Sequence, residues 1–186
     1  MCRHARAPYF CLRRHLRIHE LHASQGDDAA GRLLASWRSV TRDVASDTGV
    51  RIAKWLGDGC MIVAVEQRDG ITFAMELQRR SAAACAPLSI RVGISTGLAL
   101  LFEGDDYIGT AVNTAARLCD AAEPFEVLMP KEQIETLPEG VTSVAHAPLS
   151  LRGLPEAIPV VQLTGEPVNT ARNDTGELWT RSPFVV

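Results

Sequence analysis

The sequence predicts an α+β fold of the split βαβ type, and three observations lead to this prediction. Helical and strand patterns alternate along most of the chain, and a glycine-containing turn joins two neighbouring apolar strands as an antiparallel hairpin. The length of 186 residues suits one domain with a full-sized core. Hydrophobic residues make up 46% and charged residues 22%, which is typical of a globular protein.

The elements follow from local patterns. Asp27 or Asp28 can cap a first helix, in which apolar residues recur at helical spacing to about Ala45. Strands 50–56 and 60–65 flank Gly57-Asp58-Gly59 as a β-hairpin. The later elements are expected to be a helix over 71–84, a strand over 88–95 that turns at Gly97 into 98–102, a polar loop over 104–107, a helix over 110–122, a strand over 125–129, a helix beginning at Pro130, and strands over 141–146 and 158–163.

The two ends of the chain differ from this pattern. Residues 1–25 contain five arginines and four of the five histidines, with no acidic residue before Glu20. We expect this atypical basic segment to be disordered, so the opening strand of the fold has no recognisable counterpart. Residues 165–186 are polar, with two prolines and two glycines, and are expected to form a flexible tail. The predicted domain therefore spans 26–164.

Bulk properties exclude several classes of function. The net charge of −3 gives no general attraction to nucleic acid or to an anionic membrane. No apolar run is long enough to span a bilayer, and the basic N-terminus lacks the apolar stretch of a signal peptide. Five cysteines at irregular spacing are expected to be free thiols. These features favour a cytoplasmic protein.

Two motifs suggest phosphate chemistry on a nucleotide. Asp58 lies between two glycines at the hairpin tip, where a carboxylate on a rigid scaffold can meet a divalent cation. Asn113 and Arg117 have i, i+4 spacing, so both side chains lie on one face of a helix. An acid for Mg²⁺ beside an amide and a guanidinium suits a bound nucleotide. Trp37 and Trp55 are expected in the core or in a dimer interface.

Four segments that contain these residues resemble the class III adenylyl and guanylyl cyclases. They are 52–64, 90–97, 106–118 and 151–161, and they occur in the family order with the family spacing, over roughly 26–163. The resemblance implies a ferredoxin-like core that pairs head to tail as a dimer. It also implies conversion of ATP to cyclic AMP and pyrophosphate with two Mg²⁺ or Mn²⁺ ions.

The resemblance also implies roles for individual residues. Asp58 matches the second metal-binding aspartate, while Asn113 and Arg117 match the pair that orients the ribose and neutralises charge at the α-phosphate. Lys54 and Asp106 match the pair that reads the purine. Because lysine donates and a carboxylate accepts, this pair is complementary to adenine N1 and N6 and favours ATP over GTP. Arg152 is a further candidate, for binding the triphosphate. The resemblance also implies a dimer, in which the purine-reading pair and the Asn113–Arg117 pair of one protomer act on substrate held by the other protomer's aspartates.

The sequence departs from the family at its first metal-binding motif, which resembles Phe-Ala-Asp-Ile-x-Gly-Phe-Thr. Residues 11–19 read Cys-Leu-Arg-Arg-His-Leu-Arg-Ile-His in its place, and there is no aspartate before Asp27. A back-translation of residues 10–19, shifted by one nucleotide, encodes Ser-Ala-Phe-Ala-Asp-Ile-Ser-Gly-Phe. We therefore formulate the hypothesis of a nucleotide insertion or deletion near the start of the gene.

Three functional hypotheses remain. The first is an adenylyl cyclase-type homodimer whose activity is impaired by the missing aspartate. The second is a catalytically inactive homologue that binds nucleotide or pairs with another cyclase domain. The third is a zinc-dependent nucleic-acid module built from Cys11, His15, His19 and His22, but their spacing does not match a two-Cys two-His finger.

Overall fold

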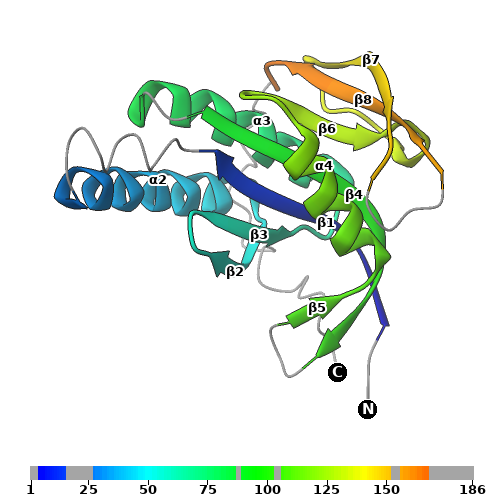
Figure 1. Cartoon of the computed structure of the whole chain (residues 1–186), viewed down its shortest axis with the longest axis horizontal. Coiled ribbons are helices and arrows are strands. Elements are labelled where there is room, and N and C mark those ends of the chain that lie inside the picture. Colours follow the sequence, from blue (N-terminus) through cyan, green and yellow to red (C-terminus); the bar gives the residue numbers. More distant parts are fainter. Residues whose placement is uncertain (1–3, 16–26, 87–88, 103–105, 152–155, 168–186) are drawn as a thin grey trace, which may run out of the picture.

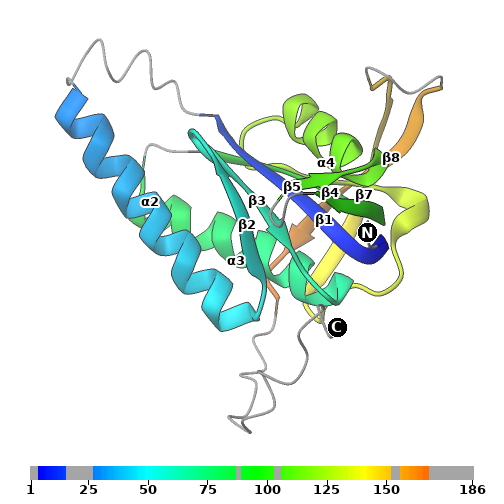
Figure 2. The ribbon, with the colours of Figure 1, turned by 90° about the horizontal axis from the view of Figure 1, so that it is seen from below.

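Eight strands form one sheet in the part of the chain that the structure, a computed structural model, describes: residues 4–15, 27–86, 89–102, 106–151 and 156–167. Helices cover both faces of this sheet (Figures 1 and 2). The strands are β1 His4–His15, β2 Arg51–Leu56, β3 Gly59–Val63, β4 Ser89–Phe102, β5 Asp106–Ile108, β6 Val127–Pro130, β7 Val141–Leu149 and β8 Ile158–Gly165. The helices are α2 Asp27–Thr48, α3 Gln67–Ala84 and α4 Thr110–Ala121, with a single 3₁₀ turn, η1, at Lys131–Gln133.

The strand order confirms the split βαβ prediction. The sheet runs β2-β3-β1-β4-β6-β8-β7, and β5 pairs with the far part of β4. Each neighbouring pair among the first four strands in space is antiparallel, and the chain order is β1-α2-β2-β3-α3-β4, which is the ferredoxin-like arrangement. β6 is parallel to β4, and β8 and β7 extend the sheet as antiparallel strands.

The expected absence of an opening strand is wrong. Residues 4–15 form β1, which lies between β3 and β4 near the middle of the sheet and pairs with β4 along its whole length. Backbone ladder bonds do not require the family motif, so two flanking strands can order a segment whose own pattern is atypical. The disorder expected for the basic segment is therefore wrong for 4–15, while residues 1–3 and 16–26 lie outside the described part.

The two faces of the sheet have separate cores. On one face, α2 and α3 pack on side chains such as Ile62, Ile94 and Val161. On the other face, α4 packs on side chains such as Met61, Leu128 and Val160. Alternate residues of a strand point to opposite faces of the sheet, and helices cover both faces here, so β3 is buried along its whole length. Trp37 of α2 is completely buried in the first core, as the sequence predicts.

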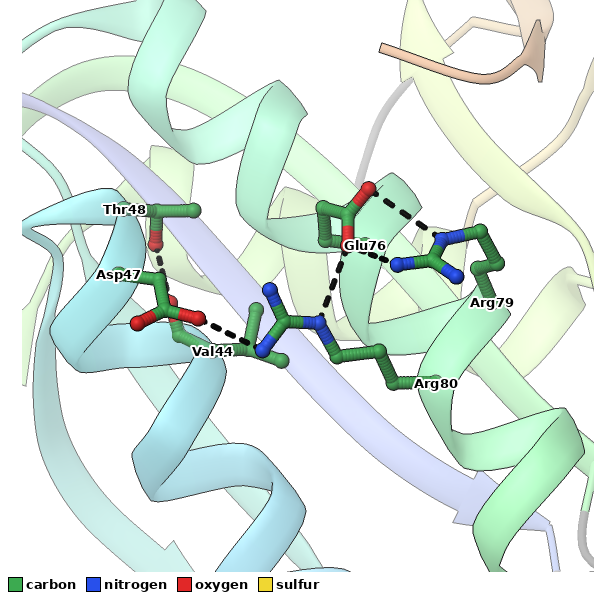
Figure 3. A network of polar contacts seen from close by, with 6 residues as sticks. All are labelled: Val44, Asp47, Thr48, Glu76, Arg79 and Arg80. Atoms are coloured by element: carbon green, nitrogen blue, oxygen red, sulfur yellow. Dashed lines mark hydrogen bonds and ion pairs between the residues drawn. The ribbon is translucent and has the colours of Figure 1, made fainter. Parts of the chain in front are cut away.

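A chain of ion pairs joins α2 to α3 (Figure 3). Glu76, which is almost fully buried, accepts hydrogen bonds from Arg79 at 2.8 Å and from Arg80 at 3.1 Å. Arg80 also donates to Asp47 of α2 at 2.6 Å. Burial raises the pKa of Glu76, but the hydrogen bonds and charges of the two arginines outweigh it and hold that pKa below its usual value.

The helix expected from Pro130 is reduced to the single 3₁₀ turn η1. Hydrogen bonds hold Gln133 at this point: its Oε1 accepts from the backbone N–H of Thr96 at 2.8 Å and from the Ser95 hydroxyl at 3.1 Å. Its carbonyl accepts from Gln67 Nε2 at 2.7 Å. These long-range contacts fix the segment as a connector rather than a helix.

The end of the chain follows the prediction only in part. β8 extends to Gly165, which the sequence assigns to the tail, and residues 168–186 lie outside the described part. Within the described residues, no helix is long and apolar enough to cross a membrane.

Candidate functional site

Asp58 occupies the tip of the β2–β3 hairpin. The last pair of the ladder is Leu56 with Gly59, so Gly57 and Asp58 alone form the turn. Gly57 has φ +63°, a left-handed conformation that glycine adopts without strain. Asp58 is half-buried, and its carboxylate has no hydrogen-bond or ion-pair partner among the side chains that the structure describes. The carboxylate is therefore available to an external cation.

Lys54 and Asp106 come together although 52 residues separate them. Lys54 Nζ donates to Asp106 Oδ1 at 2.5 Å, from β2 to the start of β5. The two side chains are 41% and 48% exposed, so a ligand can reach both. A bulge between Ile52 and Lys54 inserts one extra residue into β2 and so changes the direction of the residues beyond it. The sequence carries no signal that predicts this bulge.

Asn113 and Arg117 lie on the exposed side of α4, as their spacing predicts. The opposite side of α4 buries Ala111, Ala115 and Leu118 against the sheet. Arg117 Nη1 lies 3.6 Å from Asp120 Oδ2, one turn further along the helix. This is an exposed ion pair, of a kind that contributes little to stability and can open for a ligand.

Two glycines of β4 let α4 lie directly on the strand. A Cβ at Gly93 would meet the carbonyl oxygen of Ala115 at 2.1 Å, and a Cβ at Gly97 would meet the Cβ of Ala111 at 2.9 Å. The backbone of β4 therefore fixes the height of α4, and with it the position of Asn113 and Arg117 relative to the sheet.

A small hydrophobic cluster connects these parts. Ala53, Tyr107 and Val112 pack together with Met61, Val63, Ala99, Leu101 and Ala111. Three of these residues are the chain neighbours of Lys54, Asp106 and Asn113. Burial raises the pKa of the Tyr107 phenol, while the charge of Arg51 opposes this shift, so the phenol stays neutral at physiological pH. The apolar cluster thus supports three candidate residues from three different elements.

The predicted triphosphate residue and the place of the missing aspartate fall on residues whose side chains the structure does not describe. Arg152 lies outside the described residues. Position 14 is defined only by the backbone register of β1. Leu12 pairs with Cys60 at the end of the β1–β3 ladder, so position 14 lies two residues beyond that pair, toward the end of the sheet at which β3 begins and the Asp58 turn lies. Arg14 is the residue in this position.

The side chains fit a divalent cation that arrives with a nucleotide better than a preformed metal site. Among the described residues, no group of three histidines, cysteines or acids is placed to hold a metal ion. Mg²⁺ is commonly held by one or two carboxylates together with substrate phosphates. Asp58 supplies one such carboxylate, and the remaining ligands would come from the phosphates and from water.

Comparison with solved structures shows which fold this is. The adenylyl cyclase CyaB from P. aeruginosa superposes with a TM-score of 0.76 and 21% identity, over 91% of this chain and 98% of that chain. The chain has the fold of a class III nucleotide cyclase domain. The guanylate cyclase domain of RhGC from Catenaria anguillulae, determined in complex with GTP, gives a TM-score of 0.74 and 14% identity, over 88% of this chain and 99% of that chain.

Sequence relatives do not add an activity. The uncharacterized protein Rv2212 of Mycobacterium tuberculosis is 33% identical over 135 residues, which are 73% of this chain. The chain spans only 35% of the length of that relative. No protein-family model matches the sequence. The comparisons thus establish the cyclase fold.

Proposed function

We propose that this chain is a nucleotide cyclase-type domain that binds ATP between two copies of itself, with cyclisation to cyclic AMP and pyrophosphate impaired by the residue at position 14. The observation that carries the proposal is the contact of Lys54 with Asp106 above the cluster that also supports α4. Lys54 and Asp106 are each ordinary polar residues, but together they provide a donor and an acceptor for one purine edge.

The residues have complementary roles in this proposal. Lys54 donates to adenine N1 and Asp106 accepts from the N6 amino group, an arrangement that guanine would reverse. Asn113 orients the ribose so that its 3′ oxygen faces the α-phosphorus, and Arg117 neutralises the charge that develops on the α-phosphate oxygens. The new bond joins the 3′ oxygen to the α-phosphorus, the bond from that phosphorus to the bridging oxygen breaks, and the hydroxyl proton passes to solvent.

Asp58 would hold the divalent ion on the triphosphate. When bound, Mg²⁺ or Mn²⁺ supplies activation of the 3′-hydroxyl and neutralises the leaving pyrophosphate. In the family arrangement, Asp58 of one protomer faces the purine-reading and phosphate-reading residues of its partner. The proposed activity therefore requires a homodimer, or a heterodimer with another cyclase domain.

Position 14 is where the proposal sets the missing metal-binding aspartate, and the arginine found there is the proposed cause of the impaired activity. In the back-translation shifted by one nucleotide, the aspartate codon begins within the codon of residue 14, and at this position β1 runs beyond its last pair with β3, toward the Asp58 turn. In this proposal, a second metal-binding carboxylate belongs at position 14. An arginine there favours the second candidate, an inactive homologue that binds nucleotide or pairs with an active domain.

Restoring the carboxylate tests the proposal. Cyclic AMP formation from ATP and Mn²⁺ is measured at protein concentrations that favour dimers, for the chain as written and for Arg14→Asp. We expect Arg14→Asp to raise turnover about a hundredfold, and Arg117→Ala in that background to remove the gain, because each charge at the transition state contributes factors of this order. Nucleotide binding without turnover in either chain would support the inactive homologue, and absence of both would refute the proposal.

A further inference from the structure

Arg38 of α2 contacts the turn that carries Asp58. Its Nη2 donates to the carbonyl oxygen of Gly57 at 3.2 Å, across 19 residues of sequence. Figure 2 shows α2 running alongside the β2–β3 hairpin. Gly57 immediately precedes Asp58 in the two-residue turn, so a bond to its carbonyl restrains the peptide group that leads into Asp58.

An aromatic ring holds this guanidinium in place. Arg38 Cζ lies 5.0 Å from the ring centroid of Trp55, and Trp55 makes an edge-to-face contact of 5.6 Å with the buried Trp37. Stacking on an aromatic face restricts a planar guanidinium, so that less entropy is lost in each hydrogen bond it makes. The Trp37–Trp55 pair thus acts as a platform from which Arg38 reaches the turn.

Packing alone does not explain an arginine at position 38. Its Nε is buried and has no hydrogen-bond partner among the described residues, which destabilises the folded chain. An apolar side chain would cover Trp55 without this cost. The feature that only a donor can supply is the bond to Gly57. Arg42 provides the contrast, since its Cζ lies 5.3 Å from the same ring but the residue is exposed.

We propose that Arg38 is a positioning residue, which fixes the Gly57 carbonyl and so holds the Asp58 carboxylate in the direction needed by the nucleotide-bound cation. This inference rests on the proposed function. Groups that orient a metal-binding residue commonly change metal affinity about 10- to 100-fold when they are removed, although they never touch the ion. Gly57 is one of only two residues in the turn, so the bond from α2 acts directly on the peptide group next to Asp58.

The experiment compares Arg38→Met with the matched control Arg42→Met in the full chain. Both changes remove a cation from the Trp55 ring, but only the first removes the bond to Gly57. Mn²⁺ binding is followed by electron paramagnetic resonance with a non-cyclisable ATP analogue present, and analogue affinity is measured separately without metal. Urea unfolding of each variant shows whether the fold is kept.

We expect Arg38→Met to weaken Mn²⁺ binding about tenfold, with metal-free affinity for the analogue unchanged, and Arg42→Met to stay within about twofold of the parent. Arg38→Lys, which keeps a donor and a charge and serves if the Met variant does not fold, should regain part of the loss. Equal Mn²⁺ affinity for the Arg38 and Arg42 variants would overturn the role of Arg38 alone. No Mn²⁺ binding by the parent with the analogue present would overturn the proposed function together with it.

Discussion

Replacing Gly93 by alanine tests whether the close approach of α4 to β4 sets the site. The new Cβ would lie 2.1 Å from the carbonyl oxygen of Ala115 and 2.4 Å from the backbone nitrogen of Cys119, and real Cβ atoms essentially never approach closer than 3.0 Å. Gly93 also pairs with Leu128 of β6, which hinders retreat of the strand. We therefore expect α4 to move outward by roughly 1 Å, at a cost of about 3 kcal/mol.

Thermal unfolding followed by circular dichroism measures this cost. For a chain of this size, about 3 kcal/mol lowers the Tm by roughly 6–12 °C. Because the helix that moves carries Asn113 and Arg117, nucleotide affinity should fall as well. The control is Gly31→Ala on the exposed side of α2, where nothing lies within 4 Å of the new Cβ. It should stabilise the chain by up to about 1 kcal/mol. A Tm for Gly93→Ala within about 2 °C of the parent would refute the reasoning.

Two further predictions concern ion pairs. Lys54→Ala should lower the free energy of unfolding by no more than about 1 kcal/mol, because the ion pair with Asp106 is half-exposed. The same change should raise the dissociation constant for ATP about tenfold, as measured by titration calorimetry. A large loss of stability with unchanged ATP affinity would contradict this prediction. Glu76→Gln should destabilise the chain by about 2 kcal/mol at neutral pH, because it removes charged hydrogen bonds to Arg79 and Arg80. Since the folded-state pKa of Glu76 is lowered, its contribution is present above the unfolded value of 4.5 and is lost as the pH falls through the folded pKa, so urea unfolding curves of parent and variant should converge in acid.

Local patterns in the sequence predicted those parts of the fold that depend on local physics. The helical spacing that begins at Asp27, the glycine turn at Asp58 and the i, i+4 pair on α4 all appear in the structure. In each case the signal lies within a few residues, where backbone conformation and side-chain direction are coupled.

The sequence does not predict the features that depend on contacts between distant parts of the chain. β1 owes its order to partners about 50 and 80 residues further along the chain, so its arginine-rich sequence gives little local indication of a strand. The bulge in β2 that redirects Lys54, the turn at Gln133 that replaces a helix, and the bond from Arg38 to Gly57 likewise depend on tertiary packing. For the candidate site, the sequence predicts the residues, whereas the contacts that support them are visible only in the structure.

The central place of β1 has a consequence for synthesis and handling of the chain. Its first residues leave the ribosome long before β3 and β4, so the sheet cannot close until residue 102 has been made, and folding must wait for these non-local pairings. Any variant that loses residues 4–15 would leave β3 and β4 as two facing edges with unpaired backbone groups. Such edges recruit strands from other molecules, so N-terminal truncation should yield aggregates rather than a smaller soluble domain.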